Sequence, residues 1–268
     1  MERDREIHRM KLEKLKTVAS MKACYQGFDP VAYLHYNYTP PRADFEGRSI
    51  VPWKLSCLHK AFTEGDILVD VGSGPTLYQV MSGCERFDRV ILSDFLEVNR
   101  KVLQSWLQEG KSSIDWTAYF KYVCELEGQK ATRLRSVVSD VLPVDVHQSF
   151  PLSPEFLPPS GADCLVSSFC LESVSHDLLS FNHALGHISS LLKKGGYLLL
   201  IGALGESFYM GAPGLYIPVV PLDESQVCAS LKASGYELLQ LCIYHLPPDM
   251  KVGVDDVTAV FFAKAKKS

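Results

Sequence analysis

Residues 67–76 read Ile-Leu-Val-Asp-Val-Gly-Ser-Gly-Pro-Thr, and this stretch decides the fold. Its short apolar run predicts a buried strand, and Gly72 and Gly74 predict a tight turn directly after that strand. Ligands of parallel α/β sheets bind at the carboxyl ends of the strands. Because glycine has no Cβ, the backbone of such a turn can approach a ligand closely. The stretch therefore predicts a ligand-binding turn in an α/β fold.

Segments with strand and helix patterns alternate along the rest of the chain. Apolar runs predict further strands at 89–94, within 137–146, and at 163–169, 197–203, 236–245 and 257–265. Spacing and capping residues predict helices at 76–84, at 96–108, at 178–192 and from Asp223 to about 233. This alternation is typical of a mostly parallel sheet with helices on both faces. We expect one domain over residues 23–268, with a helical cap at 23–66 and an inserted lid at 205–221.

Composition indicates an ordinary globular protein. The chain has 268 residues and a formal net charge of -4, which counts against a nucleic-acid partner. No apolar run approaches the roughly 20 residues of a membrane span, so we expect no membrane partner. Residues 1–22 are basic, yet they carry acids and lack the apolar stretch of a secretory signal, so we expect a solvated, flexible arm. Eight cysteines form no C-x-x-C pair, which favours a reducing, cytosolic compartment. We also expect a monomer.

Residues near the glycine turn help to choose between the classes of ligand that it could bind. Asp94 ends the second predicted strand, where a carboxylate can accept hydrogen bonds from both hydroxyls of a ribose. A dinucleotide-binding G-x-G-x-x-G motif would need glycine where this chain has Leu77, and Pro75 removes an amide donor for a pyrophosphate. S-adenosylmethionine has no phosphate, so the turn suits it better. A purely structural glycine pair remains the alternative.

Several segments resemble one enzyme family. Residues 25–42 (Tyr-Gln-x-Phe-x-Pro-x-Ala-Tyr-Leu-x-x-Asn-Tyr-x-Pro-Pro-Arg), 70–76 and 94–99 (Asp-Phe-Leu-Glu-Val-Asn) resemble the nicotinamide, phenylethanolamine and indolethylamine N-methyltransferases. Residues 169–172 (Phe-Cys-Leu-Glu), 201–204, 206–209 and 253–257 (Gly-Val-Asp-Asp-Val) resemble the phenylethanolamine branch. The resemblance runs from about residue 25 to 266. It implies a Rossmann-like class I methyltransferase sheet with an antiparallel last strand, S-adenosylmethionine as cofactor, and a small aromatic amine such as noradrenaline as substrate.

The resemblance also implies roles for individual residues. Those implied to hold the cofactor are Tyr25, Tyr33, Tyr38, Gly72, Gly74, Thr76, Tyr78, Asp94, Phe95, Asn99, Asp145, Val146 and Val174. In this set, Asp145 is expected to accept from the adenine amino group. Those implied to bind the substrate are Asn37, Arg42, Lys54, Phe169, Tyr209 and Val257, with Phe169 and the Asn37 amide on opposite faces of the aromatic ring. The implied catalytic acids are Glu172, Glu206 and Asp255.

Carboxylates suit the implied reaction. A neutral amine attacks a sulfonium methyl, and positive charge moves from sulfur to nitrogen, so nearby anions favour the transition state. An alkylamine with a pKa near ~10 is mostly protonated at neutral pH. The site must therefore anchor an ammonium group and then remove its proton, which carboxylates can do. Taken singly, each of these acids could also be an ordinary solvated surface charge.

Three departures from the family pattern leave the preferred amine open. Gly205 stands in place of a polar residue, Ser173 in place of the usual alanine, and Leu246 where the branch can carry methionine. A nicotinamide or indolethylamine specificity is the sister alternative, although nicotinamide relatives carry an acid where this chain has Ile201-Gly202. An inactive cofactor-binding module is the alternative from another class, and the retained acids count against it.

Two motifs suggest a metal site but carry little weight. His183 and His187 are four residues apart on a predicted helix, yet no glutamate follows the first histidine as in zinc proteases. The pair Asp255-Asp256 could suggest a divalent site, but methyl transfer to nitrogen needs no metal. We therefore expect no metal.

Overall fold

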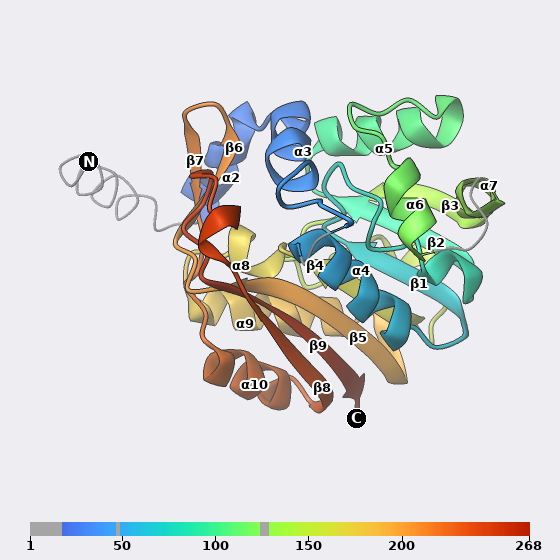
Figure 1. Ribbon diagram of the computed structural model, residues 1–268. Coiled ribbons are helices and arrows are strands. Elements are labelled where there is room, and N and C mark those ends of the chain that lie inside the picture. The colour runs from blue at the N-terminus through green and yellow to red at the C-terminus, as the bar shows by residue number, and fades with distance from the viewer. Residues whose placement is uncertain (1–17, 47–48, 124–128) are drawn as a thin grey trace.

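The computed structural model describes residues 18–46, 49–123 and 129–268, and a sheet covered by helices forms its centre (Figure 1). Over these residues the main sheet has seven strands in the order β3-β2-β1-β4-β5-β9-β8. The strands are β1 (Gly65–Val71), β2 (Phe87–Asp94), β3 (Val138–Pro143), β4 (Ala162–Ser168), β5 (Leu192–Leu204), β8 (Tyr236–His245) and β9 (Ala259–Lys267). Neighbours are parallel from β3 to β5, whereas β9 is antiparallel to β5 and β8. The expected sheet, mostly parallel with an antiparallel last strand, is confirmed.

Helices cover both faces of the sheet. One face packs against α4 (Ile50–Ala61), α5 (Glu97–Glu109), α6 (Thr117–Val123) and α7 (Gln129–Val137), and the other against α9 (Leu178–Ser189) and α10 (Glu224–Ala233). Successive residues of β1 serve opposite faces: Leu68 belongs to the first cluster and Val69 to the second. Because side chains alternate across a strand, a continuous apolar run such as that of β1 is buried on both sides.

The cap and the insertion lie together at the carboxyl end of the sheet. The cap contains α2 (Val18–Cys24), the 3-10 turn η1 (Tyr25–Gly27) and α3 (Pro30–Tyr38). The insertion is a hairpin of β6 (Phe208–Ala212) and β7 (Leu215–Pro218), which Figure 1 shows beside α2 and α3. The Asp29 amide donates to the Gly211 carbonyl at 2.9 Å, which ties the cap to the hairpin.

Two expected boundaries fall inside regular elements. The end of the arm at residue 22 lies within α2, where Met21 is only 2% exposed. Residues 1–17 of that arm lie outside the described residues. The end of the cap at residue 66 lies within β1, which begins at Gly65.

The expected helix at 76–84 is wrong. The chain there forms turns, followed by the 3-10 turn η2 (Gly83–Glu85). The Thr76 hydroxyl donates to the Ser73 carbonyl at 2.8 Å, and the Gln79 amide donates to the same oxygen at 3.0 Å. These side-chain bonds hold the glycine turn in a shape that competes with a helix.

The end of α9 and the start of β5 differ from the expected boundaries. This helix ends at Ser189 rather than 192, because Leu192 already pairs with Ala162 at the start of β5. Strand β5 is therefore longer than the expected 197–203. Capping was predicted well: Asp223 caps α10 by accepting from the Gln226 amide.

Among the described residues, none of the helices has the length and apolar character that a bilayer crossing needs.

Candidate active site

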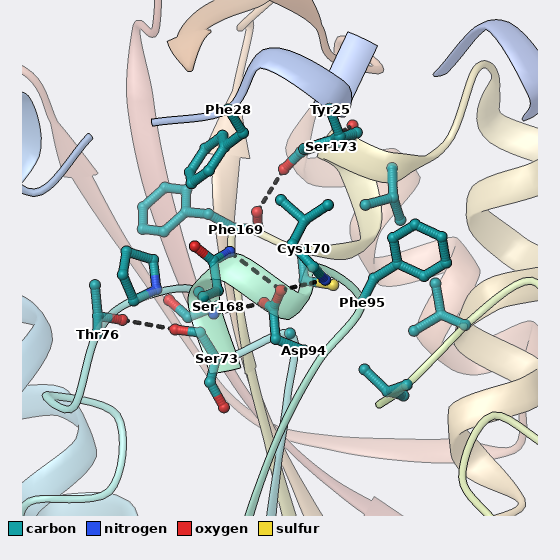
Figure 2. A pocket seen from close by; sticks show the side chains of 18 of the residues that line it. Tyr25, Phe28, Ser73, Thr76, Asp94, Phe95, Ser168, Phe169, Cys170 and Ser173 are labelled. Carbon is teal, nitrogen blue, oxygen red and sulfur yellow. Dashed lines mark hydrogen bonds between the residues drawn. The ribbon is translucent and has the colours of Figure 1, made fainter. Parts of the chain in front are cut away.

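The larger of two adjoining cavities opens where β1, β2 and β4 end. It encloses about 870 Å³ together with its mouth, within the roughly 300–1,000 Å³ range of small-molecule sites. Figure 2 shows side chains from the glycine turn, the end of β2 and the segment after β4 facing one space, with Phe28 and Tyr25 of the cap above them. We call it the larger cavity.

The glycine turn at the floor of this cavity requires both of its glycines. Gly72 and Gly74 have φ angles of +75° and +59°, which L side chains rarely adopt. A Cβ on Gly72 would also lie 2.3 Å from the Cys170 sulfur. The turn therefore presents bare backbone beside the cavity.

Asp94 holds this turn in place. One carboxylate oxygen accepts from the Gly74 amide at 2.7 Å, and the other accepts from the Leu96 amide at 2.8 Å and the Asn99 side chain at 3.1 Å. Burial raises the pKa of Asp94, and these hydrogen bonds oppose that rise. A carboxylate has roughly four acceptor positions, so about one remains for a ligand hydroxyl. Asp94 is thus a turn-holding residue as well as a candidate ribose acceptor.

Most residues that the sequence assigned to the cofactor line the larger cavity. They are Tyr25, Tyr33, Tyr38, Gly72, Gly74, Thr76, Asp94, Phe95, Asn99, Asp145, Val146 and Val174. Tyr78 is the exception: it is 1% exposed, lines neither cavity, and bonds the Ser168 hydroxyl at 2.5 Å. Its ring lies behind that of Tyr38, with centroids 5.4 Å apart, so it supports the wall.

Sequence reasoning missed other lining residues. They are Met21, Lys22, Phe28, Ser73, Pro75, Gln79, Leu96, Val144, His147, Ser168, Cys170 and Ser173. Most are chain neighbours of predicted residues, and adjacency could have found them. Lys22 had no such signal, because it lies in the segment interpreted as a solvated arm.

The smaller cavity encloses about 540 Å³ together with its mouth. Every residue that the sequence assigned to the substrate lines it: Asn37, Arg42, Lys54, Phe169, Tyr209 and Val257, together with the acids Glu206 and Asp255. Ile50 and Val260 were missed. A common wall joins the two cavities, since both are lined by Tyr33, Tyr38, Phe169, Ser173 and Tyr209.

Asp255 is engaged by a buried ion pair. Two Arg42 nitrogens donate to its two oxygens at 2.6 and 2.9 Å, and the side chains are only 6% and 7% exposed. Arg42 also donates to the Asn37 side-chain oxygen at 2.8 Å. The sequence predicts a catalytic acid at 255 and a substrate contact at 42, but these groups neutralise each other. The pair lines the smaller cavity and fixes Asn37 there, and the roles predicted for Asp255 and Arg42 stay predictions.

Glu206 is buried without such a partner. It is 7% exposed, and in the described part of the chain no donor bonds its carboxyl group. Burial, then the charges of Asp255 and Glu172, hold its pKa well above the ordinary value. The preceding Gly205 has a φ of +64°, and a Cβ there would lie 2.5 Å from the Thr258 hydroxyl. Gly205 therefore acts by turning the backbone after β5.

Glu172 lies behind the cavity walls, on the short helix α8 (Leu171–Val174). It is 1% exposed and lines neither cavity, and its side chain accepts from the Ala203 amide at 3.0 Å. Burial raises the pKa of Glu172 to about 7. Its charge also raises the pKa of Glu206, so the ionisation of one carboxyl group disfavours that of the other.

Lys54 is surrounded by aromatic rings. Its nitrogen lies 4.7, 4.3 and 4.9 Å from the ring centroids of Tyr38, Tyr78 and Phe169. Burial, and then the positive charge of Arg42, lower its pKa well below the ordinary value. Its nitrogen can donate hydrogen bonds to a ligand from beside these rings.

Phe169 has an unusual backbone that Ser173 supports. Its φ of +54° lies in the left-handed region, where residues other than glycine are uncommon. The Phe169 amide donates to the Ile201 carbonyl at 2.9 Å, and the Ser173 hydroxyl donates to the Phe169 carbonyl. Ser173, one of the three residues that depart from the family pattern, lines both cavities. Leu246, another of the three, is buried in the core and lines neither cavity.

The two metal motifs have other partners. His187 Nδ1 lies 2.9 Å from the Val146 carbonyl, while His183 is exposed. Asp256 accepts from the Ser207 amide at 2.7 Å, outside the smaller cavity. Within the described ranges, no three histidine, cysteine, aspartate or glutamate side chains gather as metal ligands would.

The chain is similar to known methyltransferases in sequence. The profile of the NNMT/PNMT/TEMT family matches residues 16–268. Phenylethanolamine N-methyltransferase of Sus scrofa is 47% identical over 93% of this chain and 92% of its own length, and that of Homo sapiens is 46% identical over the same shares. Nicotinamide N-methyltransferase of Sus scrofa is 38% identical over 82% of this chain and 86% of its own.

Solved structures agree on the fold. A SAM-dependent methyltransferase of Methanosarcina mazei has a TM-score of 0.55 at 14% identity, covering 78% of this chain and 95% of that one. A Burkholderia thailandensis N-methyltransferase, solved with S-adenosylhomocysteine, has a TM-score of 0.51 at 15% identity, covering 89% and 87%. From its sequence matches, with the sheet and the glycine turn in agreement, the chain belongs to the NNMT/PNMT/TEMT family of S-adenosylmethionine-dependent methyltransferases.

Proposed function

We propose that this chain transfers the methyl group of S-adenosylmethionine to the amine of a phenylethanolamine-type substrate such as noradrenaline. The observation that carries the proposal is the buried, unpartnered carboxyl group of Glu206, in a cavity that shares a wall with a nucleoside-sized one. Relatives named phenylethanolamine N-methyltransferase at 46% and 47% identity support this substrate over nicotinamide.

The larger cavity fits a nucleoside without phosphates. Carboxylates at Asp94 and Asp145 are acceptors for hydroxyl and amino groups, whereas a phosphate would need cations and free amides. The Lys22 ammonium at this cavity is already bound by Asp145 at 2.7 Å, and Pro75 has no amide hydrogen. When bound, S-adenosylmethionine supplies an electrophilic methyl group on a sulfonium.

The smaller cavity supplies groups that bind, orient and deprotonate the amine. Phe169 and the Asn37 amide can flank an aromatic ring, and Glu206 can bind the ammonium group. Burial and the neighbouring acids raise the pKa of Glu206, and a cation bound beside it would lower that pKa and favour the ionised form. One of the two acids then takes the proton of the substrate, Glu206 directly or Glu172 through water or Glu206. The acid that stays ionised stabilises the charge that develops on nitrogen.

The two basic residues of the smaller cavity, Arg42 and Lys54, repel the substrate ammonium group less than free cations would. The Asp255 carboxylate balances the charge of Arg42, whose two terminal nitrogens donate to its oxygens at 2.6 and 2.9 Å. Burial, and then the charge of Arg42, lower the pKa of Lys54, so its protonated form is less favoured here than in water. What remains is a site with a net preference for cations near Glu206.

We also propose that the protein is a cytosolic monomer that acts on small molecules, not on nucleic acid or membranes. The supporting observation is that the cysteines of the described residues are free, which suits a reducing compartment.

A methyl-transfer assay tests the proposed substrate class. Noradrenaline, phenylethanolamine, tryptamine and nicotinamide would each be offered with labelled S-adenosylmethionine. We expect turnover of the two β-hydroxylated phenylethylamines to exceed that of the other two. Turnover of nicotinamide alone would contradict the proposed substrate class. Cofactor binding without turnover of any amine would indicate an inactive binding module.

The pH dependence of kcat/KM is expected to report Glu172. Its pKa is raised to about 7, so the group is neutral below that pH and cannot accept a proton. We therefore expect kcat/KM to fall as pH falls through about 7, and to level off above it, because the amine binds as an ammonium group with a pKa near ~10. Steady-state rates between pH 5 and 9 measure the profile.

Glu172→Gln isolates this effect. In that variant the fall near pH 7 is expected to disappear, because glutamine does not titrate. Glu224→Gln, an exposed acid on α10, is the matched control and should keep the wild-type profile. An unchanged fall in Glu172→Gln would assign it to another group.

A further inference from the structure

Lys22 contacts the larger cavity from an unexpected direction. Its nitrogen lies 2.7 Å from an Asp145 oxygen and 5.1 Å from the centroid of the Phe95 ring, and all three residues line the cavity. Helix α2, which carries Lys22, is anchored by the buried Met21 and contacts α8 and β7. Lys22 therefore reaches across from the cap to the loop after β3.

The position along the cavity suggests which part of a ligand Lys22 meets. Figure 2 shows Phe95 on the other side of the pocket from Thr76 of the glycine turn. Asp145 lies in the loop beyond β3, the strand next to β2. The ion pair thus lies on the Phe95 side of the cavity, away from Thr76 and the glycine turn.

We propose that Lys22 is a cofactor-retaining residue, which binds Asp145 and covers Phe95 so as to close the cavity over the adenine of S-adenosylmethionine. This inference rests on the cofactor placement of the proposed function. It adds a positioning residue from the segment that the sequence predicts to be a solvated arm.

The ion pair leaves Asp145 able to bind a base. One oxygen accepts from Lys22, and the other accepts from the His147 amide at 3.1 Å. Roughly two of the four acceptor positions of the carboxylate remain, enough for an exocyclic amino group. Partial burial alone would raise the pKa of Asp145, but the bonds from Lys22 and His147 outweigh it, and the carboxyl group stays ionised. Lys22 thus orients the acceptor rather than competing for it.

Phe95 provides the second contact. This ring is 43% exposed, unusually open for a large apolar side chain beside a cavity. The aliphatic stem of a lysine can cover apolar surface while its ammonium stays hydrated. A purine in the cavity and the stem of Lys22 above it would remove much of this ring from water.

The experiment compares binding of S-adenosylmethionine and S-adenosylhomocysteine to wild type and Lys22→Ala by titration calorimetry. The Lys22 and Asp145 side chains are 39% and 21% exposed, so solvent screens the pair and the effect is moderate. We expect Kd for both ligands to rise about threefold to tenfold, and the difference to shrink in high salt. The effect should appear in KM for the cofactor rather than in KM for the amine.

Three further variants show whether the lysine acts through Asp145. Lys22→Arg should restore most of the affinity, because the ion pair can still form. In an Asp145→Asn background, Lys22→Ala should matter less than in wild type. Lys101→Ala removes an exposed lysine that pairs with Glu97 at 2.8 Å on α5, and it should leave Kd unchanged.

Thermal unfolding checks that each variant is folded. An unchanged Kd in a folded Lys22→Ala variant would overturn the inference, and a lower Kd would show that the lysine obstructs the cavity. Failure of wild type to bind either ligand would instead refute the proposed function, and this inference with it.

Discussion

Glu206→Gln is expected to lower kcat by about 10²- to 10⁴-fold while the cofactor still binds. Glutamine keeps the size of the side chain but cannot take a proton or carry the anion that favours charge on nitrogen. Glu206 lines the smaller cavity and not the larger one, so the binding of S-adenosylhomocysteine should change little. The same change removes a buried carboxyl group whose pKa is raised by burial and by neighbouring acids, so the fold should not be weakened.

Single-turnover methyl transfer and calorimetry measure the two quantities separately. Glu237→Gln, an exposed acid on β8, is the matched control and should keep the wild-type rate. Glu206→Asp should retain part of the activity, because a shorter carboxylate can act through water. A rate unchanged in Glu206→Gln would remove Glu206 from the mechanism and place proton removal on Glu172.

Arg42→Met is expected to lower the free energy of unfolding by about 3–5 kcal/mol. It removes one partner of a buried pair and leaves Asp255, 7% exposed, without its two donors. For a chain of this size that loss lowers Tm by roughly 6–20 °C. Differential scanning calorimetry measures it, and KM for the amine should rise as well because Asn37 loses the bond that fixes its amide.

A double variant separates the stability effect from the binding effect. Replacing both partners, as in Arg42→Met with Asp255→Leu, should recover much of the lost stability, because no unpaired charge remains. It should not recover the KM for the amine. A single Arg42→Met variant as stable as wild type would show that the pair is dispensable for the fold.

The sequence was most informative where one local rule governs the outcome. A run of apolar residues ending in glycine can hardly be anything but a buried strand and turn, and β1 with Gly72 and Gly74 followed that rule. Capping was equally local: Asp223 accepts from an amide three residues later. The antiparallel last strand was implied by the family resemblance alone, since pairing between distant strands has no local signature.

The sequence was misleading where distant partners decide. Thr76 and Gln79 have ordinary helix spacing, but their side chains bond the Ser73 carbonyl and keep the segment in turns. The motif around Asp255 gave no sign of the ion pair with Arg42, which lies 213 residues away. The sequence did not indicate the role of Lys22. A lysine in a basic arm has the same sequence pattern whether it is solvated or pairs with Asp145 at the cavity.

The wall common to both cavities has a consequence for inhibitor design. The two cavities are both lined by Tyr33, Tyr38, Phe169, Ser173 and Tyr209, so a single layer of side chains lies between them. A single molecule that joins adenosine to an arylethylamine by a short tether would reach both at once. Binding of one half then raises the effective concentration of the other to about the millimolar range or above. Such a tethered compound exploits a geometry that neither fragment alone can use.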